Sequence, residues 1–175
     1  KKVKMQFPYA KALKVLPAAL APLGPDYIKV LKRGMKPGSG WMDLYPGKDK
    51  NSGAFSASVY GVHPYVKMNY FDGVDDLSTL AHEFGHALHS FLSMKAQPYI
   101  SFNYAPFNAE IASTFNEKLL SDYLLKNAKN DKQRLYLLGE LAETIRTTIY
   151  RQTLFAEFEL AIHTAVEKGT PVTAK

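Results

Sequence analysis

The stretch from His82 to His86, HEFGH, constrains this chain more than any other, because its chemistry requires a helix. Two histidines four residues apart project from one face of a helix and can bind the same zinc ion. Glu83 then lies beside a zinc-bound water, where it can act as a general base. The five residues therefore indicate a zinc peptidase, with His82 and His86 as metal ligands and Glu83 as the catalytic residue.

The sequence around this motif favours a helix from about residue 75 to about residue 93. Three acidic residues at its start, Asp72, Asp75 and Asp76, suit the free amides and the positive end of a helix dipole. Apolar residues recur beside the histidines at steps of three and four: Leu77, Leu80, Ala81, Phe84, Leu88 and Phe91. The alternative is a helix in which two histidines are four apart by coincidence.

A catalytic zinc usually has three protein ligands, so a third one is expected outside the motif. In metzincins a glycine lies three residues, and a third histidine ligand six residues, after the second ligand. Here these two positions hold His89 and Leu92, which excludes the metzincin class. A second helix is predicted from about Pro106, and its first acidic residue is Glu110, 24 positions after His86. An antiparallel return of this helix would bring Glu110 beside the histidines as the third ligand. A solvated glutamate in the first turn is the alternative.

Four further residues are candidates by type and spacing. Glu117 lies seven positions after the predicted third ligand on the same helical face, and it could orient a ligating imidazole or pair with a surface lysine. His89 lies seven positions after the first ligand and is equally consistent with a buried, hydrogen-bonded histidine. His63 and Tyr60 are candidates for stabilising the oxyanion by residue type alone.

The expected fold is mainly α with a small β-sheet (α+β), in a single domain covering residues 1–175. A helical lead-in is predicted for residues 1–40, a small sheet for 41–70, the zinc-site helices for 75–127 and a long helical tract for 131–168. The second zinc-site helix and the long tract each carry an apolar stripe. The stripe of the second zinc-site helix consists of Ile111, Phe115, Leu119 and Tyr123. The stripe of the long tract consists of Leu135, Leu138, Ala142, Ile145 and Ile149.

Short strands are predicted near residues 41–45, 54–60 and 65–70. The middle strand alternates between two sets of side chains: Phe55, Ala57 and Val59, and Ser56, Ser58 and Tyr60. An exposed strand of this kind can hold an extended peptide by main-chain hydrogen bonds. A purely structural hairpin is an equal alternative.

Composition narrows the remaining functional classes. With 175 residues, 46% of them hydrophobic, the chain can form one core, and no apolar run approaches the ~20 residues that span a bilayer. No membrane partner is therefore expected. The net charge of +6 is dispersed rather than clustered, which disfavours nucleic-acid binding. The lack of cysteine excludes thiolate ligands and fits a reducing compartment, so a cytoplasmic location is expected.

Residues 79–90 (TLAHEFGHALHS) and 109–117 (AEIASTFNE) closely resemble the oligoendopeptidase F branch of the thimet oligopeptidase family. The resemblance continues in the same order on both sides of these motifs, in residues 52–56, 60–66, 97–99 and 151–159. It implies a mostly helical, zincin-like catalytic core that holds one Zn²⁺ per chain and cleaves short peptides inside a deep channel.

Members of this family are several times longer than 175 residues. The resemblance therefore implies a fragment whose partners include the missing flanking segments of the same architecture, as well as short peptide substrates. The family's substrate-binding tyrosines, and a histidine thought to steady the reacting carbonyl, lie beyond the matched region. The expected function is a zinc-dependent endopeptidase with a zinc-bound water as nucleophile. The alternative is a zinc-binding but catalytically incompetent fragment or an interaction module.

Overall fold

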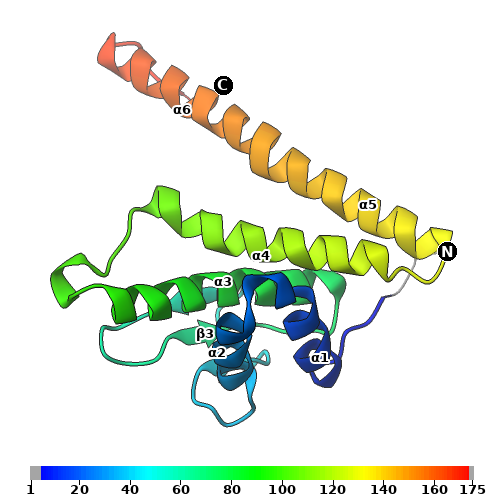
Figure 1. Cartoon of the computed structure of the whole chain (residues 1–175). Coiled ribbons are helices and arrows are strands. Elements are labelled where there is room, and N and C mark those ends of the chain that lie inside the picture. Colours follow the sequence, from blue (N-terminus) through cyan, green and yellow to red (C-terminus); the bar gives the residue numbers. More distant parts are fainter. Residues whose placement is uncertain (1–4, 174–175) are drawn as a thin grey trace. The chain divides into compact units, whose positions relative to one another are not determined.

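The computed structural model describes residues 5–173, which form helices and one small three-stranded sheet (Figure 1). The mainly α fold with a small sheet that the sequence predicts is confirmed. The chain divides into two compact units, one ending at Ala128 and the other beginning at Lys129. The single-domain organisation stays a prediction.

Two short helices open the first unit. Helix α1 (Tyr9–Ala19) contains Pro17, and helix α2 (Pro25–Met35) begins at a proline, whose fixed φ angle suits the first helical position. A single 3₁₀ turn, η1 (Ala21–Leu23), connects them. Both α-helices lie within the predicted helical lead-in.

The sheet has the strand order β1-β3-β2 and is shorter than predicted. Strand β1 (Met42–Asp43) is parallel to β3 (Tyr65–Lys67), while β2 (Phe55–Ala57) is antiparallel to it, with Ser56 opposite Val66. Strand β2 therefore forms one edge of the sheet.

The alternation predicted around β2 is present, but the apolar side faces outward. Phe55 and Val59 are more than half exposed, whereas the hydroxyl oxygens of Ser56 and Ser58 are buried and lack a hydrogen-bond partner among the described residues. A strand with an apolar exposed face is unusual for a surface hairpin and is typical of a sheet that another element covers.

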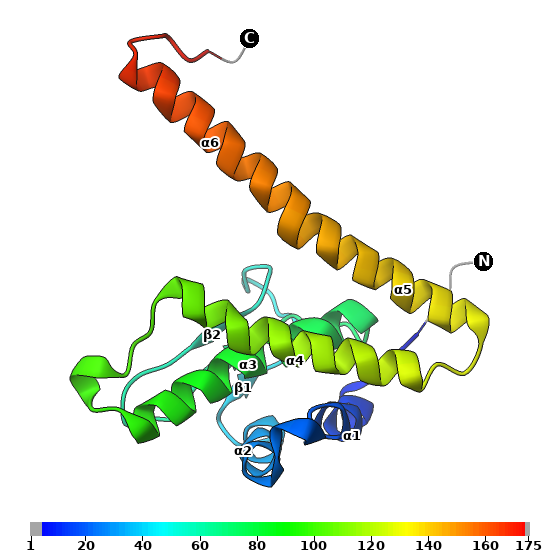
Figure 2. The ribbon, with the colours of Figure 1, turned by 45° about the horizontal axis from the view of Figure 1, so that its top comes forward.

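Helices α3 (Val74–Ala96) and α4 (Pro106–Lys126) lie side by side in both views (Figures 1 and 2). A loop with a 3₁₀ turn, η2 (Tyr99–Ser101), connects them. The start of α3 is capped by Asp76, whose Oδ2 accepts a hydrogen bond from the Gly73 amide at 2.8 Å. The apolar stripe predicted for α3 forms the centre of the core, with five members fully buried: Leu77, Leu80, Ala81, Phe84 and Leu88.

The apolar stripe predicted for α4 is only partly covered, with Leu119 and Tyr123 half-buried. Ile111 and Phe115 are more than half exposed. The residues of α4 that are buried are Ser113, Asn116, Leu120 and Leu124. Two polar side chains can occupy this buried face because each has a hydrogen-bond partner: Asn116 bonds to the Ala81 carbonyl of α3, and Ser113 bonds to Glu110 within α4.

The second unit consists of α5 (Asp131–Ile145), a π-helical turn, η3 (Arg146–Tyr150), and α6 (Arg151–Glu167). The apolar stripe predicted for this tract is exposed throughout: Leu135, Leu138, Ala142, Ile145 and Ile149. No helix among the described residues is long and apolar enough to cross a membrane.

Candidate metal centre

The backbones of α3 and α4 approach each other at Gly85, within the HEFGH motif. A Cβ atom at this position would lie 2.5 Å from the Cα of Ser113 and 2.8 Å from the carbonyl oxygen of Ala112. Only glycine permits this contact, because both neighbouring atoms belong to the backbone and cannot rotate away. The close approach brings the N-terminal part of α4, which carries Glu110, next to the two histidines of α3.

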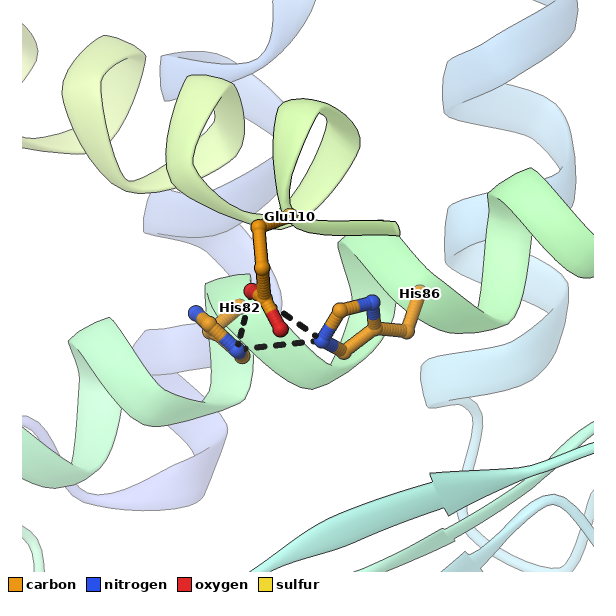
Figure 3. Close-up of side chains that lie close together, drawn as sticks. All are labelled: His82, His86 and Glu110. Atoms are coloured by element: carbon orange, nitrogen blue, oxygen red, sulfur yellow. Dashed lines mark hydrogen bonds and ion pairs between the residues drawn. The ribbon is translucent and has the colours of Figure 1, made fainter. Parts of the chain in front are cut away.

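Three side chains meet where the helices are closest (Figure 3). The Nε2 atoms of His82 and His86 lie 3.1 Å apart, and Oε2 of Glu110 lies 3.4 Å from the first and 3.6 Å from the second. Zinc bonds of about 2.0–2.1 Å in tetrahedral geometry would place the ligand atoms about 3.3 Å apart. The three donor atoms therefore fit one zinc ion, and the set of two imidazoles and one carboxylate matches a catalytic zinc site.

Glu117 contacts the opposite side of the His82 ring. The Nδ1 of His82 lies 2.6 Å from Oε1 of Glu117, and the other carboxylate oxygen accepts a hydrogen bond from Ser78 at 3.0 Å. A carboxylate accepts only from a protonated nitrogen, so this bond places the ring proton on Nδ1 and leaves the Nε2 lone pair free for a metal.

The two histidines differ in their electrostatic environment. Burial lowers the pKa of His82, but the hydrogen bond and charge of Glu117, together with the charges of Glu83 and Glu110, raise its pKa above the ordinary value. Burial, followed by the charge of His82, lowers the pKa of His86 below the ordinary value. His86 is therefore the more readily available neutral ligand.

Glu83 is nearly buried, with 6% of its surface exposed. Burial raises the pKa of its carboxyl group above the ordinary value; the charge of His82 opposes this rise, and the charges of Glu110 and Glu117 add to it. A buried carboxylate with a raised pKa, adjacent in sequence to a candidate metal ligand, has the properties of a candidate general base.

Two polar residues at the α3–α4 interface were not among the candidates predicted from the sequence. The Ser113 hydroxyl lies 2.7 Å from Oε2 of Glu110. The Asn116 side-chain amide donates to the Ala81 carbonyl at 3.0 Å and lies 2.9 Å from the Tyr27 hydroxyl. Ser113 lies three positions after Glu110, and Asn116 lies three positions after Ser113. This helical spacing from the predicted ligand was the signal in the sequence that could have identified them.

The remaining candidates lie in other contacts. The ring of His89 stacks on Tyr104 with centroids 3.8 Å apart, and its Nδ1 atom is buried without a partner among the described residues. His63 stacks on Trp41, and its Nδ1 lies 2.9 Å from the Pro64 carbonyl oxygen.

Tyr60 donates to the Gln97 carbonyl at 3.2 Å and packs against Tyr99 and Phe102. Within residues 5–173, neither His63 nor Tyr60 hydrogen-bonds or stacks with the three clustered side chains. Their assignment as oxyanion donors stays a prediction.

A helix carrying HEFGH whose histidines meet a glutamate from an antiparallel helix defines the class of zinc-dependent metallopeptidases. The sequence comparison gives the family. The model of peptidase family M3 matches residues 1–175, so the chain belongs to this family. The resemblance to the oligoendopeptidase F branch is thereby confirmed.

Among curated relatives, oligopeptidase PepF of Bacillus subtilis is 47% identical over 169 residues, which are 97% of this chain and 25% of that protein. The plasmid-borne oligoendopeptidase F of Lactococcus lactis is 39% identical over 97% of this chain and 28% of its own length. A crystal structure from Chlamydophila abortus matches 98% of this chain and 29% of its own, with a TM-score of 0.83 and 42% identity. The chain thus spans about a quarter of the length of these relatives.

Proposed function

We propose that this chain carries the zinc site and the general base of an endopeptidase that hydrolyses short peptides. The observation that carries this proposal is the meeting of the donor atoms of His82, His86 and Glu110 at separations suited to one zinc ion. Oligopeptidase and oligoendopeptidase relatives support the substrate class.

In this proposal, His82, His86 and Glu110 hold one zinc ion per chain. When bound, the metal would lower the pKa of a water and polarise the scissile carbonyl. Glu83 accepts the proton of the attacking water, since burial raises the pKa of its carboxyl group and makes it a stronger base, and then delivers that proton to the leaving amine. Glu117 holds the proton of His82 on Nδ1 throughout.

We place the substrate as an extended strand beside β2. This strand lies at the edge of the sheet, where main-chain groups can pair with a peptide of any sequence. Such backbone pairing would suit an enzyme that accepts many short peptides.

A variant of the general base tests the chemical role. Glu83→Gln should retain the zinc content of the wild type while hydrolysis of a quenched peptide of about eight residues falls by ~10²–10⁴-fold, because an amide cannot accept the proton. Glu167→Gln, at the exposed end of α6, is the matched control and should change neither quantity. Loss of zinc in Glu83→Gln would make this residue a ligand instead of a base.

The same assay distinguishes the proposed peptidase from a second candidate function, a zinc-binding but catalytically incompetent module. The contacts of His63 and Tyr60 favour this candidate, because their hydrogen bonds go to backbone carbonyls away from the metal ligands. A missing oxyanion donor typically costs ~10²–10³ in turnover. Zinc-loaded wild-type chain with no hydrolysis above that of Glu83→Gln would establish the incompetent module.

A further inference from the structure

We propose that Ser113 is a positioning residue for the metal ligand Glu110: its hydroxyl fixes the direction in which the carboxylate faces the two histidines. The inference rests on the proposed zinc-binding function. Ser113 Oγ lies 2.7 Å from Oε2 of Glu110, the same oxygen atom that faces His82 and His86.

The two partners differ sharply in exposure. The side chain of Glu110 is 59% exposed, whereas Ser113 is completely buried. An exposed glutamate on a helix surface has several rotamers available and loses that freedom when it binds a metal. A hydrogen bond from a buried neighbour restricts these rotamers before the metal arrives.

Ser113 can act as a reference point because its backbone packs directly against α3. Its Cα and amide nitrogen lie against Gly85, where a Cβ atom would approach them to 2.5 and 2.8 Å. The position of the hydroxyl relative to α3 is therefore set by the helix–helix contact. A hydroxyl occupies only one lone pair of a carboxylate oxygen and leaves the others for the metal.

A purely structural role would give Ser113 a different main partner. Serine in a helix commonly bonds to a carbonyl of the preceding turn, and the Glu110 carbonyl oxygen lies 3.1 Å from the same hydroxyl. The shorter contact, however, is made with the carboxylate. Hydrogen bonds to an ionised acceptor are also the stronger kind.

A serine hydroxyl also bonds to Glu117, although at the oxygen that does not face the histidine. Ser78 donates to one oxygen of Glu117 at 3.0 Å, and the other oxygen faces His82 at 2.6 Å. Each acidic residue that contacts a metal-ligand histidine thus receives one serine hydroxyl. This repetition supports a positioning role for the serine at each site.

The test compares three variants by zinc affinity, measured by competition with a chelator, and by the unfolding free energy of the metal-free chain. Ser113→Ala should weaken zinc binding by ~10–100-fold, as is typical for groups that orient metal ligands. Thr114→Ala is the matched control, because the Thr114 hydroxyl bonds to the Glu110 carbonyl and not to the carboxylate. Ser90→Ala removes a buried hydroxyl that pairs with Tyr104, so it reports the effect on stability alone. Both controls should bind zinc like the wild type.

A double variant separates positioning from general damage. In a Glu110→Ala background, Ser113→Ala should cause no further loss of zinc affinity, because the carboxylate on which it acts is gone. The absorption spectrum of the cobalt-substituted chain should also change in Ser113→Ala, since the ligand field depends on the direction of the carboxylate.

Wild-type zinc affinity in Ser113→Ala would overturn the inference, as would an equal loss in Ser90→Ala or a further loss in the Glu110→Ala background. These results differ from a failure of the proposed function. That failure would appear as an absence of zinc binding by the wild-type chain, or as unchanged binding in His82→Ala.

Discussion

The two ring nitrogens of His82 have separate tasks. Nδ1 pairs with Glu117, and Nε2 faces His86 and Glu110. The charge of Glu117 raises the pKa of the ring, so a proton competes with the metal for Nε2 at a higher pH than at an ordinary histidine. Glu117 thus fixes the orientation of the ligand and also makes metal binding sensitive to acid.

A pH series of zinc affinity tests this dual role. Because the folded-state pKa of His82 is raised, wild-type affinity should begin to fall at a higher pH on acidification than in Glu117→Gln. The variant removes the charge of Glu117, the residue that contributes most to raising the pKa of His82, and leaves burial, which lowers this pKa, opposed by the charges of Glu83 and Glu110. At pH 8 the variant should bind zinc more weakly, by up to ~10–100-fold. An onset of zinc loss at the same pH in both proteins would contradict the role of Glu117.

The metal centre depends at the scale of elements on how closely α3 and α4 approach. Gly85 lets the two backbones touch, and Asn116 bonds to the Ala81 carbonyl one residue before the first ligand. The face of α4 that carries Glu110 and Glu117 is therefore held in register with the HEFGH motif.

Gly85→Ala should separate these helices. The added methyl group would overlap backbone atoms of Ser113, so we expect a loss of about 1–3 kcal/mol in the unfolding free energy together with weaker zinc binding. Gly139→Ala in α5 is the control: its Cβ would meet no atom within 4 Å, and we expect a gain of about 0.5–1 kcal/mol. Urea denaturation with and without zinc measures both effects. Unchanged stability of Gly85→Ala would show that the helices can shift without cost.

The sequence predicted the motif helix and its buried stripe because both follow from local spacing. The meeting of Glu110 with the histidines was also predicted, since a catalytic zinc needs a third ligand and an antiparallel return of the next helix after a loop containing Pro98 brings its first acidic residue beside them. The packing face of α4 was not predictable from hydrophobicity, because Ser113 and Asn116 are polar. Their burial is favourable because Asn116 bonds to Ala81 across the interface, Ser113 bonds to Glu110 within α4, and the backbones touch at Gly85.

Three exposed apolar side chains near the start of α4, Phe107, Ile111 and Phe115, form a second stripe that should promote self-association. Replacing Phe107 and Ile111 with lysine should reduce association in sedimentation velocity while changing the unfolding free energy by less than about 0.5 kcal/mol, because both side chains are already exposed. Leu120→Ser, at a buried position of the same helix, should instead destabilise the chain. An unchanged sedimentation profile in the lysine variant would show that this stripe does not mediate association.

The whole chain combines a complete set of candidate metal ligands with large apolar faces on α4, α5 and α6. It spans about a quarter of the length of its relatives in peptidase family M3. The side chains that could hold zinc all come from two helices of one compact unit, residues 5–128. Metal binding can therefore be tested separately from peptide hydrolysis.

The most direct test of this account is the zinc content of the purified chain, measured by elemental analysis after dialysis against trace zinc. The wild type should contain one zinc per chain, and His82→Ala, His86→Ala and Glu110→Ala should each lose it or bind it far more weakly, because each removes one ligand from the cluster. Full zinc occupancy in Glu110→Ala would contradict the account and would direct the search for the third ligand to Glu117.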